Sequence, residues 1–305
     1  MSGTKSPRSR PKRLPIALSH ADKVFWPDEG YTKRDLVDYY AAAFPRLRPY
    51  VTDRLLSFER CPDGIAGKCF FQKQKPKGLP LQTSSQRLAH VADASKSTEY
   101  VVGGSLETQL AMANLGCIAV HVMASRASAP RLPDWICVDI DPESGEFADA
   151  ARAALRVKAA FDELSVETFV KTSGNRGLHV FVPIRVGPDA REALDFAKAF
   201  TRRVAAAFPL ELTVEQSVAA RHGRVYLDPF RNGYGQTVVA PHSVRRRAAA
   251  PISTPLAWTD VVPSLDPVAF NLGNFASRSG HPDPWSTFFE RRQSLDDVRH
   301  RLEHL

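Results

Sequence analysis

The stretch DWICVDIDP, which begins at Asp134, constrains the fold more than any other part of the sequence. Its apolar residues predict a buried strand, and the period of two puts Asp139 and Asp141 on one face with Ile140 on the other. Pro142 ends the strand, so the two carboxylates lie at its carboxyl edge, a frequent ligand position in α/β sheets. Such close carboxylates repel each other unless a cation or a shared proton intervenes. A hard divalent ion such as Mg²⁺ or Mn²⁺ prefers oxygen ligands, and the alternative is a strand end capped by solvated aspartates.

Hydrophobic periodicity and capping residues divide the rest of the chain into helices and strands, mixed without strict alternation. Helices are predicted at residues 32–44, 105–115, 147–164 and 189–208. Strands are predicted at residues 55–60, 118–124, 136–140, 168–171, 178–184, 225–227 and 237–240. This order predicts an α/β or α+β architecture with a central sheet.

Charge and composition narrow the function classes only partly. The chain has 305 residues, 43% of them hydrophobic, which is enough to bury one large core or two smaller ones. Lys and Arg outnumber Asp and Glu by 41 to 33, an excess that suits a polyanionic partner without identifying it. No apolar segment approaches the ~18 residues of a membrane span, so no membrane association is expected.

The four cysteines do not form a CxxC pair. Cys117 and Cys137 lie in apolar runs, and together with Cys61 and Cys69 they are predicted to be reduced, mostly buried thiols of a cytoplasmic protein.

The two ends of the chain differ in character from its centre. Residues 1–17 are predicted to be a disordered basic arm, which either keeps the protein soluble or contacts phosphates. Residues 18–290 are predicted to form one catalytic domain, and residues 291–305 a helical tail that packs against it.

The stretch KTSGNRGLHVFVPI predicts a tight turn between two strands. Its glycines let the backbone approach an anion, and the N–H groups of such a turn can hold phosphate oxygens. Ser173, Arg176 and His179 add a hydroxyl, a positive charge and an imidazole. The alternative is a hairpin whose glycines only satisfy the turn geometry.

A third carboxylate follows in VYLDPFRNGYGQTVVAPHSVRRR. Asp228 ends a strand before a proline and could complete a cluster of three carboxylates. Arg231 follows on the loop, and Arg245 begins an arginine triplet. Metal-binding carboxylates beside guanidinium groups suit a triphosphate, whereas a solvated basic loop is the alternative for the triplet.

Five ordered motifs resemble one known family. ADKVFWPDEGYTKRDLVDYY, CPDGIAGKCFFQK, DWICVDIDP, KTSGNRGLHVFVPI and LDPFRNGYGQTVVAPHSVRRR resemble the polymerase domain of bacterial DNA ligase D, of the archaeo-eukaryotic primase superfamily. The resemblance runs from about residue 18 to about residue 285. It implies a stand-alone member with a primase-type catalytic fold, in which RRM-like central antiparallel or mixed sheets are flanked by helices.

The resemblance also implies a role for individual residues. Asp139, Asp141 and Asp228 match catalytic aspartates that hold two divalent ions, Mn²⁺ or Mg²⁺. The family positions that hold the incoming nucleotide correspond to Ser173, Arg176, His179, His121 and Arg245. The family positions that contact DNA correspond to three groups of residues. Lys23 and Lys33 match a site for a downstream 5′-phosphate, and Phe70 and Phe71 match an aromatic pair that stacks on the template. Arg231 is a further DNA-binding position.

The implied function is a template-directed nucleotidyltransferase, a DNA repair primase-polymerase of non-homologous end joining that uses NTPs or dNTPs. Its expected partners are gapped DNA with a 5′-phosphate, double-strand-break ends, Ku and a separate DNA ligase, in the cytoplasm at the nucleoid. A primase or damage-tolerant polymerase with a replication role, a non-catalytic DNA-end-binding adaptor and a metal-dependent nuclease remain alternatives.

Three positions depart from the family pattern. Glu59 stands where a basic residue is frequent, His20 replaces a polar amide, and Arg231 stands where a glutamine occurs in other members. These departures bear on nucleotide affinity and gap preference more than on the chemistry.

Overall fold

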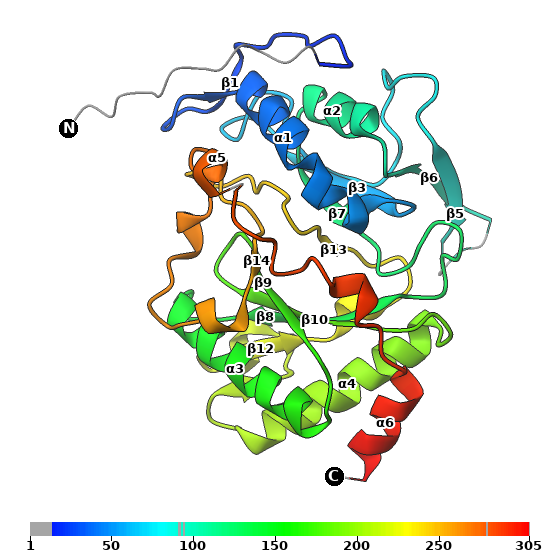
Figure 1. The fold of residues 1–305 in the computed structure, drawn as a ribbon, viewed down its shortest axis with the longest axis vertical. Coiled ribbons are helices and arrows are strands. Elements are labelled where there is room, and N and C mark those ends of the chain that lie inside the picture. The colour runs from blue at the N-terminus through cyan, green and yellow to red at the C-terminus, as the bar shows by residue number, and fades with distance from the viewer. Residues whose placement is uncertain (1–13, 91–92, 94, 279, 305) are drawn as a thin grey trace.

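The computed structural model describes residues 14–90, 93, 95–278 and 280–304. Most of the predicted basic arm at residues 1–17, including its five basic side chains, lies outside these residues. Two six-stranded sheets form the centre of the molecule. Helices α1 and α2 cover one sheet from outside, and α3 and α4 cover the other (Figure 1). The predicted mixed α/β architecture is confirmed.

The first sheet has the strand order β11-β12-β8-β10-β9-β14. β11 and β12 are parallel, and the other neighbours are antiparallel. Its strands are β8 (Trp135–Asp141), β9 (Phe169–Thr172), β10 (Leu178–Pro183), β11 (Leu212–Thr213), β12 (Val225–Asp228) and β14 (Pro255–Leu256).

Alternation along β8 separates two environments, as the period of two predicts. Ile136, Val138 and Ile140 pack into one core with α3 (Phe147–Glu163) and α4 (Ala190–Ala207). The residues between them point to the opposite face, where Trp135 and Cys137 join the other large core and Asp139 and Asp141 follow. The carboxylates therefore lie on the face of this sheet that its helices leave uncovered.

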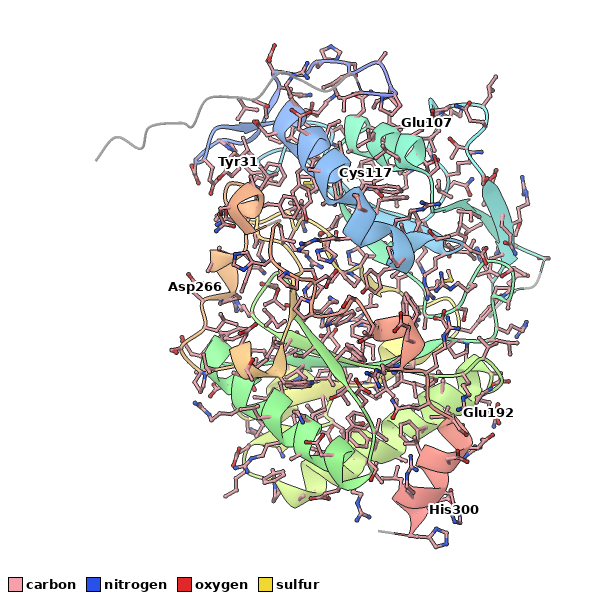
Figure 2. All side chains as sticks on the ribbon, viewed as in Figure 1. Tyr31, Glu107, Cys117, Glu192, Asp266 and His300 are labelled. Atoms are coloured by element: carbon pink, nitrogen blue, oxygen red, sulfur yellow. A yellow bond between two sulfur atoms is a disulfide. The ribbon has the colours of Figure 1, made fainter. Side chains whose placement is uncertain are left out.

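The second sheet has the order β13-β7-β3-β6-β5, with β4 paired to β3. Its strands are β3 (Leu55–Arg60), β4 (Phe70–Gln72), β5 (Ser85–Ala89), β6 (Ser97–Val102), β7 (Cys117–Val122) and β13 (Val238–Val239). The strands outside the two large sheets are the hairpin β1 (Val24–Trp26) and β2 (Tyr31–Thr32), and the other α-helices are α1 (Lys33–Val51), α2 (Leu106–Asn114), α5 (Phe275–Arg278) and α6 (Leu295–Glu303). In Figure 2, Cys117 of β7 lies in the interior beneath α1, whereas Glu192 and His300 lie at the periphery.

The largest error in the predicted elements concerns α1. A capping box of Thr32 and Asp35 starts this helix where the sequence predicts. The helix then continues to Val51, past Pro45 and Pro49, whereas the prediction ends it at residue 44. Each proline removes a backbone donor, but burial of the apolar face of the last turns offsets this cost. Strands β1, β2, β4, β5, β6, β11 and β14 were also not predicted. Five of these have only two or three residues and carry little periodicity, and β5 and β6 contain several polar residues.

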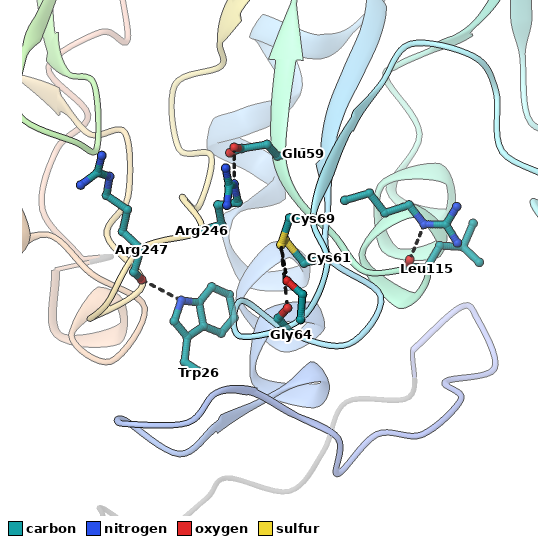
Figure 3. Close-up of a disulfide and its surroundings, with 10 residues drawn as sticks. Trp26, Glu59, Cys61, Gly64, Cys69, Leu115, Arg246 and Arg247 are labelled. Carbon is teal, nitrogen blue, oxygen red and sulfur yellow. Dashed lines mark hydrogen bonds and ion pairs between the residues drawn. A yellow bond between two sulfur atoms is a disulfide. The ribbon is translucent and has the colours of Figure 1, made fainter.

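The prediction that all four cysteines are reduced is wrong for two of them. Cys61 and Cys69 form a disulfide, while Cys117 and Cys137 are free and buried (Figure 3). The cause is strand register: β3 and β4 are antiparallel, and their last pair is Arg60 opposite Phe70. The flanking residues 61 and 69 therefore face each other, with 4.3 Å between their Cα atoms.

The disulfide closes a ring of residues 61–69, which packs on the β1 hairpin. The amide of Ile65 donates to the carbonyl of Phe25 at 2.9 Å. A side chain at Gly64 would meet the backbone of Phe25 at 2.9 Å, so this close approach requires glycine. Asp63 of the ring forms an ion pair with Lys23.

A buried ion pair joins the two sheets. Arg54 lies directly before β3, and its Nη2 is 2.5 Å from Oδ1 of Asp134, which lies directly before β8. The Arg54 guanidinium also donates to the carbonyls of Met123 and Ala124 and stacks 3.4 Å above the Trp135 ring. Both charged side chains are excluded from solvent, and burial lowers the pKa of Arg54 while the Asp134 carboxylate opposes this shift.

Two further features concern the tail and membranes. Helix α6 lies within the predicted tail, and its Leu295, Val298 and Leu302 are buried against the core of the first sheet. Among the described residues, no helix combines the length and apolarity needed to cross a membrane.

We expect that Asp134→Ala lowers the free energy of unfolding by about 3–5 kcal/mol, because it leaves the Arg54 guanidinium buried without its partner. Asp162→Ala is the matched control, since it removes an exposed ion pair with Lys158 and costs at most ~0.5 kcal/mol. Denaturant unfolding of both variants checks this. Equal losses in the two variants would contradict the role of the pair.

Candidate active site

Three aspartates meet at one edge of the first sheet. Asp228 of β12 lies directly opposite Asp139 of β8, and Tyr226 lies opposite Asp141. Directly opposed residues of antiparallel strands have Cβ atoms about 5 Å apart. Asp139 and Asp228 are buried, with 6% and 7% of their surface exposed. The register thus brings the three sequence-predicted carboxylates together.

Arg231 lies between two of these carboxylates. Its Nε is 3.1 Å from Oδ2 of Asp139 and 3.3 Å from Oδ2 of Asp228. The short helical turn Phe230–Asn232, directly after β12, carries this arginine back over the strand end. Within the part of the chain that the structure describes, no three His, Cys, Asp or Glu side chains form a ready-made metal cluster. In this arrangement, the guanidinium is the cation that bridges the two carboxylates and offsets part of their charge.

The three carboxyl groups have different proton affinities. Burial and the charge of Asp139 raise the pKa of Asp141 to about 7. Burial, followed by the charge of Asp139, also raises the pKa of Asp228. Burial alone would raise the pKa of Asp139, but the contacts with His179 and Arg231 hold it below its usual range. The cluster therefore holds more negative charge than Arg231 offsets.

His179 of β10 lies on the other side of Asp139. The register pairs these two residues directly, and His179 Nε2 is 3.2 Å from Oδ1 of Asp139. Burial and the neighbouring Lys171 lower the pKa of His179 to about 4. The imidazole is thus neutral at physiological pH, and its contact with Asp139 is a hydrogen bond from the Nε2–H.

The glycines of the turn between β9 and β10 allow two close approaches. Gly174 has φ +68°, and a side chain there would meet Arg245 Cγ at 2.6 Å. A side chain at Gly177 would meet the carbonyl oxygen of Ile140 at 2.1 Å. The Ser173 hydroxyl accepts from the amides of residues 175 and 177 and closes the turn. Arg245 is therefore brought against the turn, as the sequence motif requires.

A cavity of about 210 Å³ lies between the two sheets at this point. It is lined by His121, Asp139, Asp141, Ser173, Asn175, His179, Arg231, Thr237, Val238, Val239 and Arg245. Seven of these lining residues are site residues that the sequence predicted. Burial lowers the pKa of His121 well below its usual value, and its Nε2 has no hydrogen-bond partner among the described residues.

Arg176 does not line this cavity. It is exposed and lines a neighbouring cavity of about 520 Å³ together with Arg247. Asn175 lines both cavities, and its Oδ1 is buried without a partner within the described residues. The two cavities are thus adjacent, and Arg176 is at the outer one.

Phe70 and Phe71 lie on β4 with 41% and 47% of their surface exposed. The Phe71 ring contacts the His121 ring edge-on, with 5.2 Å between centroids. Phe71 therefore lies at the rim of the carboxylate cavity. Packing in a hydrophobic core does not explain two neighbouring phenylalanines that are this exposed.

Lys23 and Lys33 lie at a distinct place, on the β1 hairpin and at the start of α1. Lys33 is buried, and its Nζ donates to the carbonyl of Ser19 at 2.8 Å. Burial and the charge of Lys23 lower the pKa of Lys33, so the two ammonium groups are close enough to repel each other. His20 is exposed in the preceding turn, where its φ is +48°.

Glu59 lies on β3, next to the strand that carries Phe70 and Phe71. Its Oε1 is 2.5 Å from Nε of Arg246, while its Oε2 is buried without a partner among the described residues (Figure 3). Glu59 lies directly opposite Phe71 in the register. The departure from the family pattern at Glu59 therefore places a carboxylate beside the exposed Phe71. This carboxylate forms an ion pair with Arg246.

The sequence interpretation missed two residues behind the site. Lys171 and Ser253 are both fully buried, and Lys171 contacts His179 from the side opposite to Asp139. Lys171 could have been noticed, because a lysine at the end of an apolar strand seldom lies in a core. No sequence pattern points to Ser253, which comes from a distant irregular segment.

Comparison with known proteins identifies the family. The model of the LigD primase-polymerase domain matches residues 32–285. Among solved structures, the polymerase domain from Mycobacterium tuberculosis ligase D in complex with DNA is 27% identical, with a TM-score of 0.82. The match covers 92% of this chain and 100% of that one.

Full-length relatives give the same result. The Bacillus subtilis bifunctional non-homologous end joining protein LigD is 28% identical over 302 residues, 97% of this chain and 48% of that protein. The Pseudomonas aeruginosa multifunctional LigD is 27% identical over 305 residues, 96% of this chain and 35% of that protein. The chain thus spans half or less of the length of these relatives. The chain belongs to the LigD primase-polymerase domain family, a family of DNA-directed nucleotidyltransferases.

Proposed function

We propose that this chain is a template-directed nucleotidyltransferase that fills gaps and extends DNA ends with NTPs or dNTPs in non-homologous end joining. The observation that carries the proposal is the cluster of Asp139, Asp141 and Asp228. The first two of these carboxylates line a cavity that is also lined by Ser173, His179 and Arg245. An adaptor that only binds DNA gains nothing from three clustered carboxylates, since they repel the DNA backbone.

The chemistry of the three carboxylates fits two divalent ions, Mg²⁺ or Mn²⁺. Oxygen ligands suit these ions, and the raised pKa values of Asp141 and Asp228 indicate uncompensated negative charge. Bound ions would lower the pKa of a primer 3′-hydroxyl and neutralise the triphosphate. Arg231 contacts both Asp139 and Asp228, so it must turn away before these carboxylates bind an ion.

The opposite wall of the cavity suits the triphosphate. Arg245 is a half-buried positive charge, and Ser173 and Asn175 of the turn contribute polar side chains to the cavity wall. His179 and His121 are neutral and serve as hydrogen-bonding groups and not as charges. Arg176 and Arg247 at the outer cavity would meet the end of the triphosphate or the DNA backbone.

The DNA contacts are assigned to the second sheet and the β1 hairpin. Phe70 and Phe71 offer exposed rings for stacking on unpaired template bases. Lys23 and Lys33 form a two-ammonium site that suits a 5′-phosphate, and the phosphate would replace the Asp63 carboxylate as partner of Lys23. Ku and a DNA ligase are the protein partners that the resemblance of the five sequence motifs implies.

The decisive experiment is extension of a gapped duplex by Asp139→Asn and Asp228→Asn. We expect nucleotide incorporation to fall by at least ~10³-fold, because the carboxylates that hold the reacting groups are lost. Affinity for gapped DNA should change less than threefold, since neither residue lies at the proposed DNA surface. Asp149→Asn, an acidic position on α3 away from the cavity, is the control. Extension at the wild-type rate by either variant would falsify the proposed function.

A second expectation concerns stability. The pKa of Asp141 is raised in the folded protein to about 7, so its favourable contribution exists at low pH and is lost as pH rises through 7. In the metal-free protein, Asp141→Asn should therefore raise the free energy of unfolding at both pH 8 and pH 5, and by about 1–3 kcal/mol more at pH 8. Denaturant titrations at both pH values measure this. A gain of equal size at the two pH values would show that repulsion is not its cause.

A third expectation concerns the downstream end of a gap. Combined Lys23→Ala and Lys33→Met should remove the preference for 5′-phosphorylated gaps, because both phosphate-facing ammonium groups are lost while methionine preserves the packing at residue 33. The measurement is the ratio of affinities for gapped DNA with and without that phosphate. Combined Lys68→Ala and Lys77→Ala, two exposed lysines, is the control of equal charge and should leave the ratio unchanged. A variant ratio equal to that of the wild type would refute the assignment.

A further inference from the structure

A row of polar side chains crosses the first sheet from one strand to the next. The register pairs Asp228 with Asp139, Asp139 with His179, and His179 with Lys171. All four side chains are buried and lie on the face away from α3 and α4. The first three line the site or contact it, whereas Lys171 is separated from the cavity by His179.

Lys171 forms hydrogen bonds with His179 and Ser253, and the surroundings of these two residues determine which partner donates the proton in each bond. Its Nζ is 2.8 Å from Nδ1 of His179 and 2.6 Å from Oγ of Ser253. The single hydroxyl proton of Ser253 is donated to the carbonyl of Thr172 at 2.8 Å, so Ser253 accepts from Lys171. The Phe181 ring lies 5.7 Å from Nζ and favours a positive charge there. The Asp139 carboxylate can only accept from Nε2 of His179, which leaves Nδ1 as the acceptor nitrogen, so Lys171 donates to both of its side-chain neighbours.

The donor at Nδ1 fixes the imidazole. A neutral histidine has one N–H and one acceptor nitrogen. With Nδ1 accepting from Lys171, the proton of His179 is on Nε2, the atom that faces Asp139 and the cavity. The pair also holds the plane of the ring, since Lys171 is itself held by Ser253 and cannot follow a rotation of the imidazole.

We propose that Lys171 is a positioning residue, which keeps His179 in the Nε2–H tautomer and aims this N–H at an anionic oxygen of the substrate. The identity of the anion as a nucleoside triphosphate rests on the proposed function, whereas the tautomer does not. Ser253 supports the same arrangement from behind. The inference gives a task to a fully buried lysine that contacts neither substrate nor proposed metal ligand.

The direct test is ¹⁵N NMR of the full chain labelled at histidine, with His179→Ala to assign the resonance. In the wild type, His179 should show a protonated Nε2 and an unprotonated Nδ1. Lys171→Met is close in shape but has no donor, and should shift His179 toward a mixture of tautomers or broaden its signals. Lys171→Gln keeps an N–H donor and should restore part of the wild-type pattern. An unchanged Nε2–H signature in Lys171→Met would overturn the proposal.

Steady-state incorporation gives an independent readout. A hydrogen bond from a charged group is worth a loss of roughly ten- to a hundredfold, so kcat/KM for the nucleotide should fall by that factor in Lys171→Met. Affinity for gapped DNA should stay within twofold. In a His179→Ala background, Lys171→Met should cause no further loss, because Lys171 acts through His179. Thr201→Val, a buried hydroxyl of α4 outside the site, is the control for a change in the core.

The remaining outcomes are also decisive. If Lys171→Met does not fold, Ser253→Ala replaces it and should shift the tautomer signals in the same direction. A folded Ser253→Ala with the wild-type signature would then overturn the proposal. A full additional loss from Lys171→Met in the His179→Ala background would do the same. If the wild type shows the Nε2–H signature but incorporates no nucleotide, the proposed function fails while the positioning role of Lys171 stands.

Discussion

The register between β12, β8, β10 and β9 is the constraint on which the site depends. It places Asp228, Asp139, His179 and Lys171 in one row, opposite the face that α3 and α4 cover. A shift of one strand by a single residue would turn its member of the row into the apolar core and break the sequence of contacts. Burial of alternate residues against the two helices prevents this shift, so the packing of the helices and the geometry of the site have the same origin.

Much of this was predictable from local patterns. Period two put Asp139 and Asp141 on one face of a strand, and the proline after Asp228 marked a second strand end. The five ordered motifs then predicted the family, which the family match and the solved relative confirm. The roles of individual residues stay predictions. Strand edges and glycine turns carry their information within a few residues, which is why the sequence revealed them.

The features that the sequence did not reveal depend on contacts between distant segments. Ser253 reaches Lys171 across 82 positions, and Arg54 meets Asp134 across 80. The disulfide required the pairing of β3 with β4, and β4 is too short for periodicity to reveal it. Arg231 follows Asp228 closely in sequence, but only the turn after β12 shows that its guanidinium lies back over the carboxylates. In each case, the sequence identifies the residue type but does not identify which residue it contacts in the folded protein.

The ring of residues 61–69 has a geometric consequence. One side of it contacts the β1 hairpin and pairs with Lys23, and Phe70 directly follows its other end. A covalent closure between these points means that the proposed downstream-phosphate site and the proposed template-stacking site are mounted on one rigid piece. The distance between them is then nearly constant, whatever the rest of the second sheet does. A gapped DNA that engages both proposed sites must therefore match a separation that the protein holds nearly constant.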